Sequence, residues 1–234
     1  LPLEQTSAWE VFDWAVGGRL PWRKLVWLVD GEPRAFLTAT KMRGRGFTYL
    51  WAKHGPVWAG RTPSAREEAA FRFDLVRVVR SLEPEVDFVR LHAHHRADGL
   101  RELLQSVTYD RTVILDLRKD ADALLASMKK RGRRDVRKAM RDESLVAADE
   151  TENAHAVFGE LYELLVETGE RDSFGILPQE TYEAMLVGLG PEHCRLYTVR
   201  REGRPLCWGI VTTTASQATY YYAASNDEGR KAGA

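Results

Sequence analysis

The sequence has 234 residues, of which 44% are hydrophobic and 29% are charged, enough for one large or two small folded domains. Its 34 basic and 34 acidic residues cancel, which argues against a protein that binds nucleic acid through net charge alone. No apolar run reaches the ~18 residues of a membrane span. The first residues lack the pattern of a secretory signal, and Cys194 and Cys207 stand in no metal or redox spacing.

The first half of the chain predicts an antiparallel meander followed by a long helix. Turn residues at Asp30-Gly31 and Gly44 separate short apolar runs, and apolar residues at helical spacing follow Ser64. The expected elements are a helix at 8–16, strands at 25–29, 35–42 and 47–53, a helix at 64–82, a strand at 87–92, a helix at 98–106 and a strand at 112–117.

The segment 120–142 is expected to form one helix with a concentrated positive charge. Eight of the fifteen residues from Ser127 to Arg141 are Lys or Arg. We expect the apolar stripe of this helix to be Leu124, Leu125, Met128, Val136, Ala139 and Met140.

The second half of the chain predicts two helices and a second meander. The expected elements are a strand at 145–148, helices at 154–168 and 179–189, and strands at 195–200, 206–214 and 218–224. The last eight residues predict no further strand or helix. We expect both ends to be cut from a longer chain.

The two meanders resemble each other at a constant offset of 172 positions. The turn at Gly31-Glu32-Pro33 matches that at Gly203-Arg204-Pro205, and Tyr49 matches Tyr221 without a gap. Two unrelated hairpins with common turn residues are the alternative to an internal duplication. The order of elements predicts an α+β fold with helices packed on mainly antiparallel sheets.

Five segments together resemble the Fem family of peptidoglycan-branching aminoacyltransferases (FemABX type). They are LPLEQTSAW at 1–9, YLWAKHGPVW at 49–58, SMKKRGRRDVRKAMR at 127–141, ETGERDSFGILP at 167–178 and YYYAASNDEGRK at 220–231. The resemblance implies duplicated GNAT-like (acetyltransferase-type) domains facing a cleft, at 1–118 and 119–234, the second truncated at its C-terminus.

The resemblance also implies a function. Family members transfer an amino acid from aminoacyl-tRNA to the stem peptide of a UDP- or lipid-linked peptidoglycan precursor, and so build the interpeptide bridge. A cytoplasmic enzyme at the inner face of the cell membrane, with no cofactor and no metal, is the expectation.

Several positions depart from the family pattern. Leu177 and Thr181 stand where members that bind a UDP-linked muramyl peptide have Arg and Tyr, and His92 stands at an acidic position. A Lys expected shortly after Trp9 is missing. Because of these departures, the sugar-phosphate pocket of those family members is not expected to be present unchanged in this chain.

The basic helix is the first candidate site. Lys and Arg on a helix bind phosphate through charge-assisted hydrogen bonds, and both a charged tRNA and a nucleotide-linked precursor are polyanions. A solvated helix face is the alternative. The candidate substrate-binding residues on it are Lys129, Arg133, Arg134, Arg137 and Lys138.

Three further residues are candidates. Tyr222 matches a family tyrosine in the substrate cleft, and a core tyrosine is the alternative. His92 and His54 follow strands and are expected to line the substrate site. A metal at His92 and His94 is not favoured, because only Asp98 is near in sequence.

The sequence contains no motif typical of a covalent nucleophile or of a dinucleotide-binding loop. An aminoacyl ester is already activated, so its transfer to an amine needs placement and proton removal more than covalent catalysis. The alternatives are an acyl-CoA-dependent GNAT-type acyltransferase, for which no Gly-rich pyrophosphate loop is seen, and a non-catalytic RNA- or membrane-surface-binding module.

Overall fold

The computed structural model describes residues 1–44, 46–102 and 112–234, which divide into two compact units. Unit 1 comprises Leu1–Leu100, Leu177–Arg195 and Thr212–Thr219. Unit 2 comprises the described residues of Arg101–Ile176, together with Leu196–Val211 and Tyr220–Ala234. The division of the chain at residue 118 stays a proposal.

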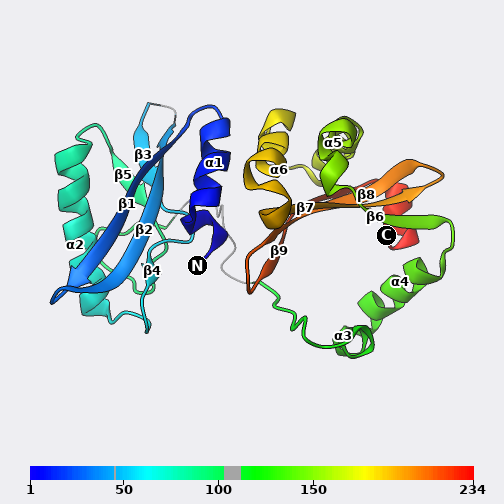
Figure 1. The fold of residues 1–234 in the computed structure, drawn as a ribbon, viewed down its shortest axis with the longest axis horizontal. Coiled ribbons are helices and arrows are strands. Elements are labelled where there is room, and N and C mark those ends of the chain that lie inside the picture. The colour runs from blue at the N-terminus through cyan, green and yellow to red at the C-terminus, as the bar shows by residue number, and fades with distance from the viewer. Residues whose placement is uncertain (45, 103–111) are drawn as a thin grey trace. The chain divides into compact units, whose positions relative to one another are not determined.

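Unit 1 contains the first meander and its helices (Figure 1). Its sheet has the order β1-β2-β3-β5, and β4 also pairs with β2. β1 and β2 run antiparallel, whereas β3 and β5 run parallel. The elements are a 3-10 turn at Leu3–Gln5, α1 (Ser7–Ala15), β1 (Arg19–Val29), β2 (Glu32–Arg43), β3 (Thr48–Trp51), β4 (Val57–Trp58), α2 (Ala65–Leu82) and β5 (Phe88–Arg90).

Helix α2 covers one face of the first sheet. Ser64 and Glu67 form a capping box that fixes its start, and Phe71, Leu75 and Val79 form its buried stripe. The strand residues in the same core are Ala35, Leu37, Ala39, Leu50 and Ala52. Because side chains alternate along a strand, Thr38 and Thr40 point to the opposite face.

Helix α1 and the turn before it lie on that opposite face. The side chain of Gln5 bonds both backbone groups of Thr38, and Thr40 donates to Asp13. α1 also packs on α6 (Gln179–His193) within unit 1. There, a Cβ added to Gly188 would lie 2.9 Å from the Cα of Phe12, so this position needs glycine for a close helix approach.

The second meander forms a four-stranded sheet, with the order β6-β7-β8-β9. One face is covered by α5, because Trp208 of β8 donates to the carbonyl of Leu161 and packs edge-on against Phe158. The remaining elements are α3 (Ala121–Ser127), α4 (Lys130–Arg141), β6 (Leu145–Asp149), a 3-10 turn at Thr151–Asn153, α5 (Ala154–Asp172), β7 (Cys194–Arg201), β8 (Arg204–Thr213), β9 (Ala218–Ser225) and α7 (Asp227–Ala232).

The α+β fold class predicted from the sequence is confirmed, and the two matched turns have the same backbone. Asp30 and Gly31 have φ of 52° and 84°, and Glu202 and Gly203 have φ of 50° and 79°. At the offset of 172, β1, β2 and β3 fall on β7, β8 and β9. The short helix α1 falls on α6 in the same way.

The single helix predicted at 120–142 is wrong, because Met128 and Lys129 are extended and separate α3 from α4. The break leaves carbonyl groups at the end of α3 without helical partners. Arg133 reaches back and donates to the carbonyl of Ala126 at 3.0 Å, which supplies one of them with a cationic donor.

The strand predicted at 112–117 is also wrong. Those residues pair with no strand in the described structure, and Val113 and Ile114 are 84% and 85% exposed. β propensity reflects packing on a sheet, so an apolar run without a partner forms no strand. Of the helix predicted at 98–106, residues 98–102 are not helical and the rest lie outside the described residues. The helix α7 was not predicted.

Candidate functional site

Helix α4 presents an exposed cationic surface in unit 2. None of its residues is buried, and Met140 of the predicted apolar stripe is 72% exposed. Of that stripe only Leu125, on α3, is buried. The prediction of a buried apolar stripe along one helix is therefore wrong, because the break after Ser127 interrupts the helical periodicity.

The predicted cations of α4 have few anionic partners. Arg134 contacts Asp135 at 3.2 Å, and Arg137 has no acceptor among the described residues. Lys138 donates to the carbonyl of Lys231 on α7, and Lys129 is the extended residue before the helix. A helix of this kind can bind phosphate groups, because its charges are fixed by the backbone and remain accessible.

A buried carboxylate positions the histidine segment that follows β5. Glu68 of α2 is 1% exposed, and its two oxygens accept the backbone N–H groups of His94 and His95 at 2.7 and 2.9 Å. Arg72 pairs with the same carboxylate at 3.1 Å. The segment is thereby fixed to α2, and the backbone N–H of His92 donates to the carbonyl of Gly55 at 2.8 Å.

His92 and His54 lie together, because each follows one of the two parallel strands β3 and β5. Their ring centroids are 5.0 Å apart, and the Nε2 of His54 lies 3.4 Å from a carboxylate oxygen of Glu4. Burial, with a smaller contribution from the charge of His54, lowers the pKa of His92. A neutral imidazole at this position can accept a proton near neutral pH.

Two further cations were missed in the sequence, Lys53 in the turn after β3 and Arg90 on β5. The Nζ of Lys53 lies 4.7 Å from the ring centre of Trp9 and 5.5 Å from that of Trp51, and Arg90 lies 5.4 Å from Trp51. Burial lowers the pKa of Lys53 to about 8. The alternation of Trp51 and Lys53 at the end of a strand was the available signal, because i and i+2 share a face.

Among the described residues, no three His, Cys, Asp or Glu side chains gather closely enough to hold a metal ion. Within residues 1–44, 46–102 and 112–234, no helix is long and apolar enough to cross a membrane.

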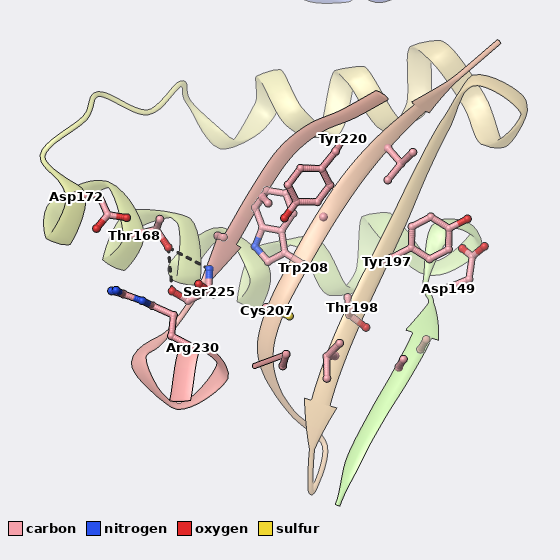
Figure 2. Close-up of a pocket in the computed structure, with 18 of the residues that line it drawn as sticks. Asp149, Thr168, Asp172, Tyr197, Thr198, Cys207, Trp208, Tyr220, Ser225 and Arg230 are labelled. Atoms are coloured by element: carbon pink, nitrogen blue, oxygen red, sulfur yellow. Dashed lines mark hydrogen bonds between the residues drawn. The ribbon is translucent and has the colours of Figure 1, made fainter. Parts of the chain in front are cut away.

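A cavity of about 810 Å³ lies on the second sheet (Figure 2). Strands β7, β8 and β9 supply most of its lining, including Tyr197, Cys207 and Tyr220. The ring of Tyr220 crosses Gly209, where an added Cβ would lie 2.8 Å from a ring carbon. Burial raises the pKa of Cys207, so its thiol is neutral at neutral pH.

One end of this cavity is polar. The hydroxyl of Thr168 accepts the backbone N–H of Ser225 at 3.2 Å, and Arg171 donates to the carbonyl of Ser225 at 2.7 Å. Arg230 lies at the same end (Figure 2). The candidate Tyr222 is half-buried on β9, and its ring packs edge-on against Tyr221 at 5.0 Å.

No family model and no curated protein sequence matches this chain. Solved structures do match. The crystal structure of FemX gives a TM-score of 0.73 at 16% identity, covering 98% of this chain and 77% of FemX. The C-terminal domain of a protein assigned as a lysylphosphatidylglycerol synthetase, from Agrobacterium fabrum, gives a TM-score of 0.42 at 13% identity, covering 88% of this chain and 61% of that domain. The chain therefore has the fold of FemX, and the predicted resemblance to the Fem family is confirmed for the fold.

Proposed function

We propose that the protein is an aminoacyltransferase that moves an amino acid from aminoacyl-tRNA to the stem peptide of a peptidoglycan precursor. The observation that carries this proposal is the FemX fold, which extends over 98% of the chain. The exposed cations of α4 support it, because they suit polyanionic substrates. The histidine pair of unit 1 supports it, because a neutral imidazole can accept a proton.

The reaction needs no covalent enzyme intermediate. The acceptor amine attacks the ester carbonyl, the amide C–N bond forms, and the ester C–O bond breaks to release a ribose hydroxyl of the tRNA. The amine loses one proton and the departing ribose oxygen gains one. The enzyme therefore has to place two substrates and move a proton.

In this proposal α4 binds phosphate groups of a substrate. Arg133, Arg134, Arg137 and Lys138 provide donors, and arginine can bind a phosphate through two parallel hydrogen bonds. Each phosphate neutralised would make affinity fall as salt rises. His92 and His54 bind the acceptor peptide, and a neutral His92 is suited to accept the proton that the amine loses.

Tyr222 and Lys129 complete the proposed substrate-binding set. The charged tRNA and the precursor meet on the cytoplasmic side, so we place the reaction at the inner face of the membrane.

A transfer assay tests this function. The protein is incubated with charged tRNA and either a UDP-linked or a lipid-linked muramyl peptide, and amide formation is followed. Acyl-CoA in place of charged tRNA is a parallel arm. Product formed only with charged tRNA is the expected result, whereas product formed only with acyl-CoA would replace the proposal with a GNAT-type acyltransferase.

A second candidate is a non-catalytic module that binds RNA or a membrane surface. The observation that favours it is the absence of buried residues on α4, which leaves the whole helix available as a contact surface. It predicts binding of tRNA or anionic vesicles that weakens steeply with salt, without amide formation in any arm of the assay.

A further inference from the structure

Three aromatic rings gather on the face of the first sheet that lies opposite α2. Tyr49 of β3 and Phe88 of β5 are partners in the parallel register, and their rings stack with centroids 5.0 Å apart and 10° between their planes. The ring of Phe47 lies 5.5 Å from that of Phe88 and 5.9 Å from that of Tyr49. The next residues along the two strands, Leu50 and Val89, point into the core beneath α2. We call Phe47, Tyr49 and Phe88 the aromatic platform.

The rings of the aromatic platform remain accessible to solvent. Phe47 is 41% exposed and Phe88 is 39% exposed. The ring of Phe47 lies over Gly44, where an added Cβ would come within 2.3 Å of a ring carbon, so glycine is needed there for the ring to take this position. Flat apolar rings held open to solvent are surfaces on which a planar group such as a nucleobase can stack.

A cation adjoins the aromatic platform. Arg90 follows Phe88 by two residues on β5, and its guanidinium lies 4.9 Å from the ring centre of Tyr49 and 5.4 Å from that of Trp51. Within the described part of the chain Arg90 forms no ion pair, and its buried Nε has no hydrogen-bond acceptor. A guanidinium that is held on two rings and keeps unused donors is suited to bind a phosphate group.

Rings and cations alternate further along the same face. The Nζ of Lys53 lies between two indole rings, 4.7 Å from the centre of Trp9 and 5.5 Å from the centre of Trp51. Proteins bind single-stranded nucleic acid with this combination, because bases stack on the rings and phosphates contact the cations. A double helix would present its bases already stacked and paired, so unpaired nucleotides fit this face better.

We propose that the aromatic platform and Arg90 form a binding site for unpaired nucleotides of RNA, in which bases stack on Phe47 and Phe88 and Arg90 binds a phosphate group. The identity of the RNA rests on the proposed function: the unpaired nucleotides are then those at the 3′ end of the tRNA, which carry the amino acid. The nucleotide of a UDP-linked precursor has the same chemistry, a base and phosphate groups, and the test separates these two sources.

The test is a titration of the protein with a single-stranded trinucleotide of RNA that carries the fluorescent base 2-aminopurine at its 3′ end. Stacking on an aromatic ring quenches this fluorescence, so quenching reports the proposed contact directly. Phe47→Leu with Phe88→Leu keeps the apolar bulk and removes the rings, and it should weaken binding at least about tenfold. Arg90→Gln should lower the slope of log affinity against log salt by about 0.7, the value for one phosphate of a single strand.

The matched control makes the same changes at an exposed pair on α2. Phe73 is 66% exposed, and the guanidinium of Arg77 lies 5.9 Å from its ring centre. Phe73→Leu with Arg77→Gln should bind the trinucleotide as the wild type does, and melting temperatures from circular dichroism show that all variants are folded. The trinucleotide carries no amino acid, so this binding is measured without transfer, and its failure is distinguishable from failure of the proposed function.

Three results would overturn the proposal. The first is the absence of quenching with the wild type, or equal weakening in the control and in the platform variant. The second is binding of UDP that depends on Phe47 and Phe88 while the trinucleotide does not bind, which would assign the site to the precursor. The third is a dimer in sedimentation experiments that Phe47→Leu with Phe88→Leu dissociates, because a second copy of the chain would then cover the rings.

Discussion

The carboxylate of Glu68 accepts the backbone N–H of His94 at 2.7 Å, and this partly buried hydrogen bond connects α2 to the segment that follows β5. A second bond from the same carboxylate reaches His95. The positions of His94 and His95 therefore depend on a residue that is distant in sequence and lies on a helix whose main role is core packing.

Replacement of Glu68 by Ala should destabilise the protein by about 2–4 kcal/mol, because two backbone donors lose their acceptor and Arg72 loses the carboxylate of its ion pair. Urea unfolding followed by circular dichroism measures the change. Glu85→Ala is the control, since Glu85 is half exposed and solvent screens its ion pair with Lys41, so its loss should change the free energy of unfolding little. Equal losses of unfolding free energy in the two variants would contradict the conclusion that Glu68 stabilises the segment after β5.

Gly188→Ala should destabilise the protein by about 1–3 kcal/mol, because the new methyl group would lie 2.9 Å from the Cα of Phe12. Gly132→Ala is the matched control on α4, where an added Cβ meets nothing within 4 Å. That change should leave stability unchanged or raise it by up to ~1 kcal/mol through helix propensity. A stable Gly188→Ala protein would show that α1 and α6 are not closely packed in solution.

The double variant Arg134→Glu and Arg137→Glu should lose aminoacyl transfer by at least about tenfold while its melting temperature stays within ~2 °C, because α4 buries no residue. Arg23→Glu with Arg77→Glu makes the same change in net charge on exposed residues of unit 1. Transfer should survive in that control. A large fall in melting temperature of the α4 variant would mean that its arginines are structural.

Lys53 should make stability depend on pH. Its pKa is about 8 in the folded protein and 10.5 when unperturbed, so between these values the unfolded chain binds more protons. The folded state is therefore penalised below about pH 8, and the penalty is relieved as pH rises towards 10.5. The contact with Trp9 favours the charged amine and offsets part of this effect. The remaining change in the free energy of unfolding is about 1–3 kcal/mol.

The measurement is the difference in unfolding free energy between the wild type and Lys53→Met at pH 7.5 and pH 10. As pH rises from 7.5 to 10, the free energy of unfolding of the wild type should increase relative to that of the variant. Lys24→Met, at an accessible lysine, is the control and should show no such trend. A difference that is independent of pH would mean that the pKa of Lys53 is not lowered.

The sequence predicted features that are encoded locally. The turn at Asp30-Gly31 needs positive φ at both residues, and the helix at 64–82 has apolar residues at helical spacing, so short patterns were enough. The matching turn at Glu202-Gly203 set the offset of 172 positions at which the two meanders align. The pairing of His54 with His92 was not predicted, because the parallel pairing of β3 with β5 joins strands that are distant in sequence.

Features that depend on distant partners were missed. The run at 112–117 has a strand composition, but only its neighbours in space could decide its structure. The role of Glu68 and the lowered pKa of Lys53 come from burial, which no spacing reveals. The break at Met128 and Lys129 interrupts a pattern whose composition continues unchanged through it.

The most direct test of the proposed function is the mass of the muramyl peptide after incubation with the protein and charged tRNA. The account predicts a gain equal to one amino-acid residue, which is lost when the tRNA is digested with ribonuclease beforehand and is strongly reduced by Arg134→Glu with Arg137→Glu. An unchanged precursor mass with every charged tRNA, from a protein that is folded and binds tRNA, would contradict it.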